Sequence, residues 1–205
     1  MTEPLKAEYD RISQQWLEVR TQLPAKDMEL FKQFVGLFDE PSKILDLGCG
    51  HATPIGEFLA GLGHSLVGVD RSKKLLAMAK ERLPNQQWVL SELEEYEIDQ
   101  TYDGVVLWDS LFHLPRVEQK RLLESAYQSL RSGGACILSS GGSEVDIPPF
   151  TDYMFEVEFY YDAYPIPQFI EICQQIGFRV VEWVWVNEPD GMRDKGRIGV
   201  LLIKP

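Results

Sequence analysis

The glycine turn in Lys43-Ile-Leu-Asp-Leu-Gly-Cys-Gly50 is the feature that most constrains the fold of this chain. The apolar residues before the turn have the pattern of a buried parallel strand. Gly48 and Gly50 permit a positive φ and close backbone approach, and a helix-compatible run begins near Pro54. A glycine loop that leads into a helix presents free backbone N–H groups and the positive end of the helix dipole. We therefore predict a ligand site at this turn.

Two acidic residues near the turn separate the cofactor classes that use it. A dinucleotide fingerprint has a third glycine where this chain has Thr53. Asp46, at the strand end, would repel a pyrophosphate but attract an ammonium group. Asp70 ends a second strand pattern twenty residues after Gly50, the spacing at which a strand-end carboxylate accepts both hydroxyls of a ribose. An amino acid and a ribose together point to S-adenosylmethionine.

Four motifs carry a resemblance to a known family. They are Ile44-Leu-Asp-Leu-Gly-Cys-Gly50, Val67-Gly-Val-Asp-Arg-Ser72, Tyr102-Asp-Gly-Val-Val-Leu-Trp-Asp109 with Phe112-His-Leu-Pro115, and Leu130-Arg-Ser-Gly-Gly-Ala135. Over residues 40–205 the chain resembles the class I S-adenosylmethionine-dependent methyltransferases, particularly the small type 11/25-like domains. It departs from the family pattern at His51-Ala-Thr-Pro54 and at Ser91-Glu92.

The resemblance implies an α/β fold with a doubly wound, mostly parallel seven-stranded sheet and a C-terminal antiparallel strand pair. We expect one domain over residues 1–205, with lid helices in 1–40, a cofactor-binding half in 41–140 and a substrate-side half in 141–205. The cofactor-binding residues that it implies are Tyr9, Trp16, Arg20, Asp46, Gly48, Cys49, Gly50, Asp70, Arg71, Glu92, Leu93, Trp108 and Asp109.

Two helical patterns precede the core, over residues 4–20 and 28–38. Under the resemblance Tyr9, Trp16 and Arg20 close over the cofactor. The alternative is that both helices only cover the edge of the sheet.

The segment from Asp146 to Tyr164 is aromatic but shows little periodicity, so we expect an irregular insertion after the fifth strand. So many aromatic side chains would leave a large apolar patch in water. We expect them to line an acceptor pocket, or else to pack on the sheet edge or a second subunit. Such a pocket suits a small, partly aromatic or cationic acceptor. The expected substrate-binding residues are Phe112, His113, Tyr153, Tyr160 and Tyr161.

His113 is the candidate general base, because it follows the fourth strand and imidazole accepts protons near neutral pH. The alternative is a structural histidine that is hydrogen-bonded to a nearby loop. Direct displacement at a sulfonium needs chiefly alignment and desolvation, so a catalytic side chain is not obligatory.

The amino-acid composition limits the classes of substrate and the cellular location that we expect for the protein. A net charge of −12 and a pI of about 4.7 disfavour a nucleic-acid substrate. No apolar run approaches a membrane span and no signal peptide is evident, so we expect a cytoplasmic protein, monomeric or homodimeric. Cys49, Cys136 and Cys173 lie in apolar patterns and should be buried free thiols; we expect no metal site.

The leading functional hypothesis is transfer of the methyl group of S-adenosylmethionine to a small-molecule acceptor. The alternatives are an NAD-type dinucleotide-binding oxidoreductase, a tRNA or protein methyltransferase, and a non-catalytic cofactor-binding module. Fold alone does not choose the substrate.

Overall fold

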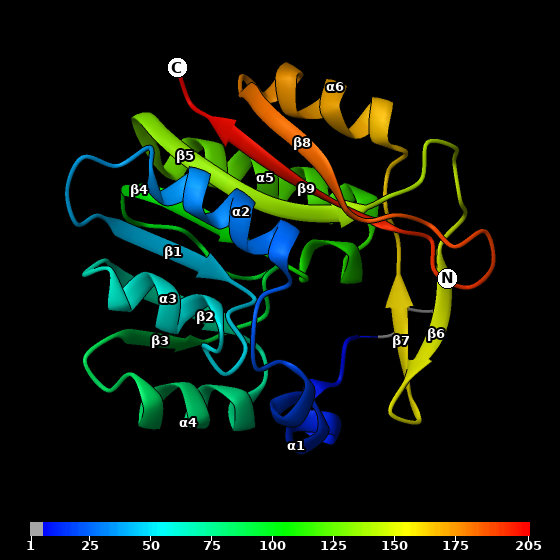
Figure 1. Cartoon of the computed structure of the whole chain (residues 1–205), viewed down its shortest axis with the longest axis horizontal. Helices are drawn as coiled ribbons and strands as arrows, with labels where there is room; N and C mark the ends of the chain where they lie inside the picture. Colours follow the sequence, from blue (N-terminus) through cyan, green and yellow to red (C-terminus); the bar gives the residue numbers. More distant parts are fainter. Residues whose placement is uncertain (1–5) are drawn as a thin grey trace.

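A seven-stranded sheet forms the centre of the computed structural model, which describes residues 6–205 (Figure 1). Its strand order is β3-β2-β1-β4-β5-β9-β8. The strands are β1 (Lys43–Leu47), β2 (Ser65–Asp70), β3 (Gln87–Leu90), β4 (Tyr102–Leu107), β5 (Leu130–Gly141), β8 (Arg179–Asn187) and β9 (Arg197–Ile203). The five strands from β3 to β5 are parallel, and β9 runs antiparallel to both β5 and β8. The expected fold class, with its C-terminal antiparallel pair, is confirmed.

Helices cover both faces of the sheet. They are α1 (Tyr9–Val19), α2 (Ala25–Val35), α3 (Ile55–Gly61), α4 (Lys73–Arg82), α5 (Arg116–Ser129) and α6 (Ile166–Ile176), with a short 3₁₀ turn η1 (Leu111–His113). The first helix begins later than the sequence predicts; residues 4 and 5 of the expected range lie outside the described residues. None of the helices in residues 6–205 combines the length and apolar character that a membrane span requires.

Alternation along the central strands divides the core into two layers. Val105 and Leu107 of β4 pack with α5 and α6, whereas Val106 packs with α2 and α3 on the opposite face. Successive strand residues point to opposite faces, so a strand that is apolar at every position is buried on both. β4 accordingly lies in the middle of the sheet. Cys136 and Cys173 lie in this core as buried free thiols, and Cys49 is buried and free in the turn.

The segment after β5 is more regular than the sequence predicts. β6 (Phe150–Met154) and β7 (Val157–Tyr161) form a separate antiparallel hairpin, which stands apart from the main sheet in Figure 1. Its two turn residues, Phe155 and Glu156, adopt positive φ values of 49° and 63°. Asparagine and glycine normally mark such a turn, so the usual sequence signal is missing. The expectation of an irregular segment was wrong for this reason.

Candidate functional site

A cavity of about 370 Å³ opens at the carboxyl ends of β1, β2, β3 and β4. Ligands of open parallel sheets bind at this edge. Every residue that the sequence analysis assigned to the cofactor lines this cavity: Tyr9, Trp16, Arg20, Asp46, Gly48, Cys49, Gly50, Asp70, Arg71, Glu92, Leu93, Trp108 and Asp109. His113 lines it as well. The fold thus brings side chains from distant segments to one place.

The glycine turn is held by backbone geometry and by one carboxylate. Gly48 has a φ of +88°, and a Cβ atom at this position would collide with the Cβ atom of Ser110. The N–H groups of Gly50 and Ser72 donate to the two carboxylate oxygens of Asp70, each at 2.8 Å. Asp70 is only 8% exposed, so the carboxylate belongs to the framework of the turn and is not a free surface group. Each oxygen keeps a second lone pair that a ribose hydroxyl could use.

Asp46 is a buried carboxyl group beside the turn, with 4% of its surface exposed. Burial, and then the negative charge of Asp70, raise the pKa of Asp46 to about 7. No basic side chain within residues 6–205 forms an ion pair with it. A cationic ligand group in the cavity would stabilise the ionised form of Asp46 and so offset the free-energy cost of burying this carboxylate.

Helix α1 closes one side of the cavity and is tied to α4. The N–H of Lys74 donates to the Oδ1 atom of Asp10 at 3.0 Å, and an Arg71 guanidinium nitrogen donates to the backbone carbonyl of Ala7 at 3.2 Å. Tyr9 and Trp16 face the cavity from α1 and pack edge to face at 5.2 Å. The N-terminal helix therefore contributes directly to the cavity wall, as the resemblance implies.

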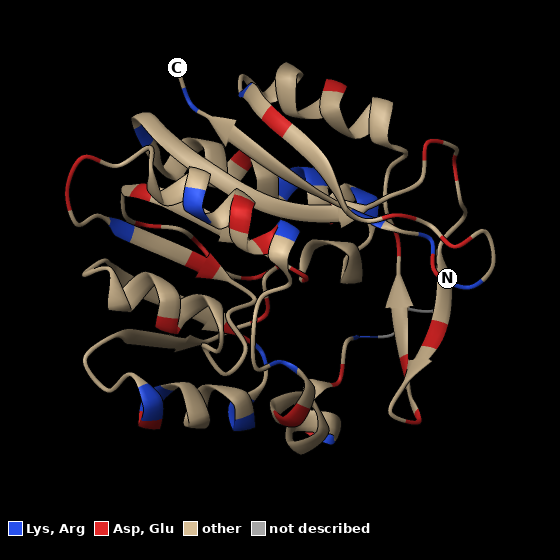
Figure 2. Cartoon of the chain, in the orientation of Figure 1, with Lys and Arg blue, Asp and Glu red and all other residues tan. Residues whose placement is uncertain are grey.

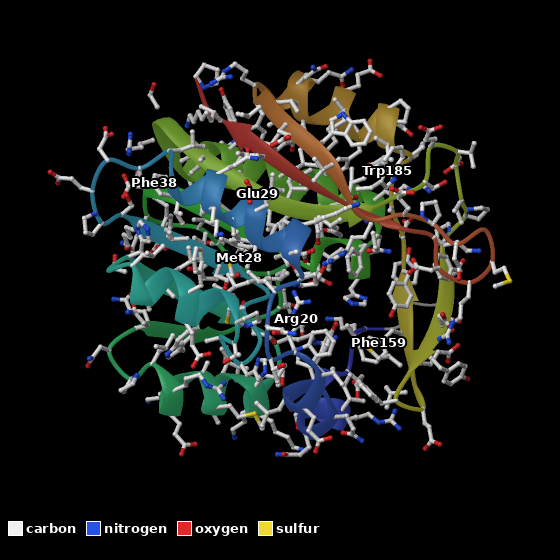
Figure 3. All side chains as sticks on the ribbon, in the orientation of Figure 1. Arg20, Met28, Glu29, Phe38, Phe159 and Trp185 are labelled. Atoms are coloured by element: carbon white, nitrogen blue, oxygen red, sulfur yellow. The ribbon has the colours of Figure 1, made fainter. Side chains whose placement is uncertain are left out.

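Four charged residues form a chain of ion pairs at the end of β4, in the order Arg20, Asp109, Arg197 and Asp27. Arg20 lies 2.6 Å from Asp109, Arg197 also contacts Asp109, and Arg197 lies 2.7 Å from Asp27, which is fully buried. Figure 3 shows Arg20 in the segment that leads from α1 to α2. Burial alone would raise the pKa of Asp109, but Arg197 and Arg20 outweigh burial and lower it. Asp109 stays ionised, and the indole of Trp108 donates to Asp27 at 3.2 Å.

His113 has both ring nitrogens occupied. Nδ1 lies 2.9 Å from the backbone carbonyl of Tyr160, which can only accept, so Nδ1 carries the hydrogen. Nε2 then accepts a hydrogen bond from the hydroxyl of Tyr9 at 3.1 Å. Burial lowers the pKa of His113 to about 4, against the opposing influence of the Tyr160 carbonyl and Asp109. This arrangement favours the alternative of a structural histidine, because the nitrogen that would take the proton is engaged and burial disfavours protonation of the ring.

Glu92 lies at the rim of the cavity, just after β3, together with Leu93. Its Oε2 atom lies 3.3 Å from the Nε atom of Arg71 and 3.5 Å from the Nζ atom of Lys6. Two cations thus hold this carboxylate between the core and the segment before α1. The position after β3 is where the resemblance places the adenine.

Solved methyltransferases share this architecture. An S-adenosylmethionine-dependent methyltransferase from Clostridium acetobutylicum ATCC 824 aligns with a TM-score of 0.72 at 14% identity, covering 95% of this chain and 98% of that one. The glycopeptide N-methyltransferase MtfA, in complex with (S)-adenosyl-L-methionine, aligns with a TM-score of 0.62 at 18% identity, covering 86% of this chain and 93% of that one. At these identities the likeness establishes the fold.

The family match comes from the sequence of the cofactor-side half. Residues 44–134 match the family model described as a methyltransferase domain. The chain contains a class I S-adenosylmethionine-dependent methyltransferase domain. Phosphoethanolamine N-methyltransferase 2 of Caenorhabditis elegans is 26% identical over 123 residues, which are 57% of this chain and 28% of that protein. The chain spans less than a third of the length of the curated relatives it matches, 29% and 28%.

A second cavity of about 510 Å³ lies in the methyltransferase domain beside the β6–β7 hairpin and the loop that joins β8 to β9. Phe112 and Tyr161, two of the residues that the sequence analysis assigned to the substrate, line it, whereas Tyr153 and Tyr160 line neither cavity. Cross-strand pairing explains the difference, because Tyr161 pairs with Phe150 on one face of the hairpin while Tyr160 pairs with Thr151 on the other. Tyr153 is 59% exposed. Tyr160 contacts lining residues of both cavities, because its carbonyl holds His113 and its hydroxyl donates to Asp162 at 3.2 Å.

His51 is a residue of the methyltransferase domain that the sequence analysis did not assign to the site. It lines the first cavity, is only 1% exposed, and its Nε2 atom has no hydrogen-bond partner within the described residues. Burial, followed by the charges of Arg82 and Arg20, lowers the pKa of His51 to about 4, so the ring is neutral at physiological pH. The available signal was the departure from the family pattern at His51-Ala-Thr-Pro54.

Proposed function

We propose that the protein transfers the methyl group of S-adenosylmethionine to a small-molecule acceptor. The observation that carries the proposal is Asp46, a buried carboxyl group without an ion-pair partner in the described chain, at the wall of a cavity that a glycine turn also lines. A buried carboxyl group with a raised pKa beside a binding cavity is suited to a cationic ligand group. The ammonium of the cofactor supplies such a group.

The residues around the first cavity fit the remaining parts of the cofactor. Asp70 lies at the end of β2 with unused lone pairs for the ribose hydroxyls. Glu92 and Leu93, after β3, are suited to flank the adenine. The unpartnered Nε2 atom of His51 and the Arg20 guanidinium offer polar contacts for the methionine end of the cofactor. These assignments are part of the proposal.

When bound, the cofactor supplies an electrophilic methyl group on a positively charged sulfur. The chain's contribution is then to orient this group and to exclude water, which are the main requirements of a direct displacement. Helix α1 covers the cavity through Tyr9 and Trp16. We assign His113 a positioning role, because its two hydrogen bonds join α1 to the hairpin strand β7. No side chain need take a proton in the transfer step itself.

A small acceptor fits the electrostatics better than a nucleic acid. The net charge is −12, and acidic residues are distributed around the helices, the hairpin and the connecting loops in Figure 2. Neutralisation of phosphates needs clustered Lys and Arg. Phosphoethanolamine N-methyltransferase 2 is by its name an enzyme that acts on a small amine, which supports a small acceptor for this chain.

The test is a product-detecting methyl-transfer screen with purified protein and radiolabelled S-adenosylmethionine. Acceptor pools of amines, phenols, carboxylates and tRNA are assayed in parallel, and Asp46→Ala serves as the matched control. Label in a small-molecule pool, lost in the Asp46 variant, supports the proposal. Label found only in tRNA would contradict a small-molecule acceptor and indicate a tRNA methyltransferase. If no pool is labelled although S-adenosylhomocysteine binds, the domain is a non-catalytic cofactor-binding module.

A further inference from the structure

The second cavity lies between the β6–β7 hairpin, η1 and the loop that joins β8 to β9. We propose that this cavity is the acceptor site and that it selects a small planar amine that carries a positive charge before it reacts. The inference rests on the proposed function, since an acceptor is meaningful only for a methyl-transfer enzyme. At about 510 Å³ the cavity has the size of sites that enclose small molecules.

Three aromatic rings give one wall of this cavity its shape. Tyr161 stacks on Phe150 with ring centroids 5.4 Å apart and planes 17° apart. It also stacks on Phe112 from η1, at 6.1 Å and 25°. The three rings line the cavity in near-parallel orientation, and together they join the hairpin to the end of β4. A planar ring or a cation packs favourably on such a wall.

The charged residues that line the cavity determine whether a cationic, neutral or anionic ligand binds against the aromatic wall. Four carboxylates line the cavity, those of Asp152, Asp162, Asp190 and Asp194, against the three cations of Arg193, Lys195 and Arg197. Asp190 and Asp194 form no ion pair within the described residues.

Two of the three cations of the lining are paired with carboxylates, whereas Lys195 forms no ion pair within the described residues and donates to the backbone carbonyl of Met192 at 2.6 Å. Arg197 is shared between Asp27 and Asp109, neither of which lines this cavity. Arg193 is held by both carboxylate oxygens of Asp152, at 2.7 and 2.9 Å. The balance of charge therefore favours a cationic ligand over an anionic one.

The linings of the two cavities touch at the end of β4. Arg197 lines the second cavity, and its guanidinium contacts Asp109, which lines the first. Phe112 and His113 are adjacent in η1 and line the second and the first cavity respectively. These contacts put the second cavity on the side of Asp109, the residue beside which the resemblance places the methyl donor.

The reaction of such an amine balances without a further reactant. The ammonium first releases its proton to solvent water. The freed lone pair on nitrogen then forms the new N–C bond to the methyl carbon, while the S–C bond of the sulfonium breaks and its electron pair remains on sulfur. The products are the methylated amine in its ammonium form, which carries the positive charge that the sulfonium loses, and the neutral thioether of the cofactor.

The test measures binding of three probes of the same size that differ in charge: 2-phenylethylamine, 2-phenylethanol and phenylacetate. Dissociation constants are measured by calorimetry on the full chain with saturating S-adenosylhomocysteine, for wild type, Tyr161→Leu and Tyr153→Leu. Tyr153→Leu is the matched control, because Tyr153 is a tyrosine of the same hairpin that lines neither cavity. Loss of the Tyr161 ring, which stacks on both Phe150 and Phe112, disrupts the aromatic wall and should weaken amine binding about fivefold or more, from a cation–π energy of roughly 1–2 kcal/mol.

The expected result is that wild type binds the amine at least about tenfold more tightly than phenylacetate, and that only Tyr161→Leu weakens amine binding. Equal affinity for amine and phenylacetate would overturn the acceptor class, and unchanged amine affinity in Tyr161→Leu would overturn the location. If Tyr161→Leu does not fold, Phe150→Leu makes the same comparison from the neighbouring ring. If the wild-type protein does not bind S-adenosylhomocysteine, the proposed function is refuted. The three probes are then titrated in the absence of S-adenosylhomocysteine, and they test the ligand preference of the second cavity alone.

Discussion

The hydroxyl of Tyr9 and the Nε2 atom of His113 lie 3.1 Å apart, although they are separated by 104 positions in the chain. This hydrogen bond joins the N-terminal helix to the end of the fourth strand, directly beside the proposed cofactor cavity. This bond occupies the Nε2 atom of His113, and it fixes the position of α1 relative to the core.

Tyr9→Phe should therefore weaken cofactor binding while it leaves the aromatic packing of α1 intact. The phenyl ring keeps the edge contacts with Trp16 and Phe159, and Figure 3 shows Phe159 on the hairpin side of this region. A neutral hydrogen bond contributes about 0.5–1.5 kcal/mol, so the dissociation constant of S-adenosylhomocysteine should rise roughly two- to tenfold. Calorimetry measures it. Were His113 a general base, the freed Nε2 atom would leave turnover equal or higher, and that outcome would restore the catalytic assignment.

Cofactor affinity should depend on pH through Asp46. Burial and Asp70 raise the pKa of this carboxyl group to about 7 in the free protein. The bound ammonium favours the carboxylate, so binding below the pKa must release a proton, and affinity falls as the pH falls. Between about pH 7.5 and pH 6 the affinity for S-adenosylhomocysteine should drop roughly tenfold. Asp46→Asn should bind weakly and show a flat profile. If the affinity of the wild-type protein does not change with pH over this range, Asp46 does not bind the ammonium group.

Asp70→Ala should lower both stability and cofactor affinity. The carboxylate accepts the N–H groups of Gly50 and Ser72, so its removal leaves two donors of the glycine turn without partners. Each unsatisfied buried donor costs about 1–3 kcal/mol. Asp70→Asn keeps one acceptor oxygen and should lose less stability, yet it should still weaken cofactor binding about tenfold, since a charge-assisted bond is lost. Urea unfolding and calorimetry separate the two effects. Full affinity in a folded Asp70→Asn variant would refute the ribose assignment.

Arg197→Met should destabilise the fold strongly. Asp27 is fully buried and pairs with Arg197 at 2.7 Å, whereas Asp109 retains Arg20. Removing one partner of a buried ion pair costs about 3–5 kcal/mol, because the other charge stays buried without compensation. The double variant Asp27→Asn with Arg197→Met removes that charge and should recover part of the loss in urea unfolding. No difference between single and double variants would show that the pair is not the source of the loss.

The local patterns of the sequence were sufficient for the parallel core. The strands β1, β2 and β4 are mostly apolar, and each ends at a glycine or an acid or within two residues of one, which the parallel topology brings to one edge. Asp46, Asp70 and Asp109 could therefore be placed together, because the carboxyl ends of parallel strands lie side by side. The helix Ile166–Ile176 was also predictable, since Gly177 ends it with a φ of 117°.

The remaining features depend on contacts that no local pattern reveals. The pairing of Asp27 with Arg197 joins residues that are 170 positions apart. The hairpin turn uses Phe155 and Glu156 in place of the residues that usually mark such a turn. Because the hairpin was not predicted, its two-residue alternation was not available to separate Tyr160 from Tyr161.

The most direct test of the central claim is calorimetric titration of the full chain with S-adenosylhomocysteine and, separately, with NAD. The proposed cofactor site predicts saturable binding of S-adenosylhomocysteine, a release of protons below about pH 7 that Asp46→Asn abolishes, and no binding of NAD. Binding of NAD with no heat from S-adenosylhomocysteine would contradict the account and favour a dinucleotide-binding oxidoreductase.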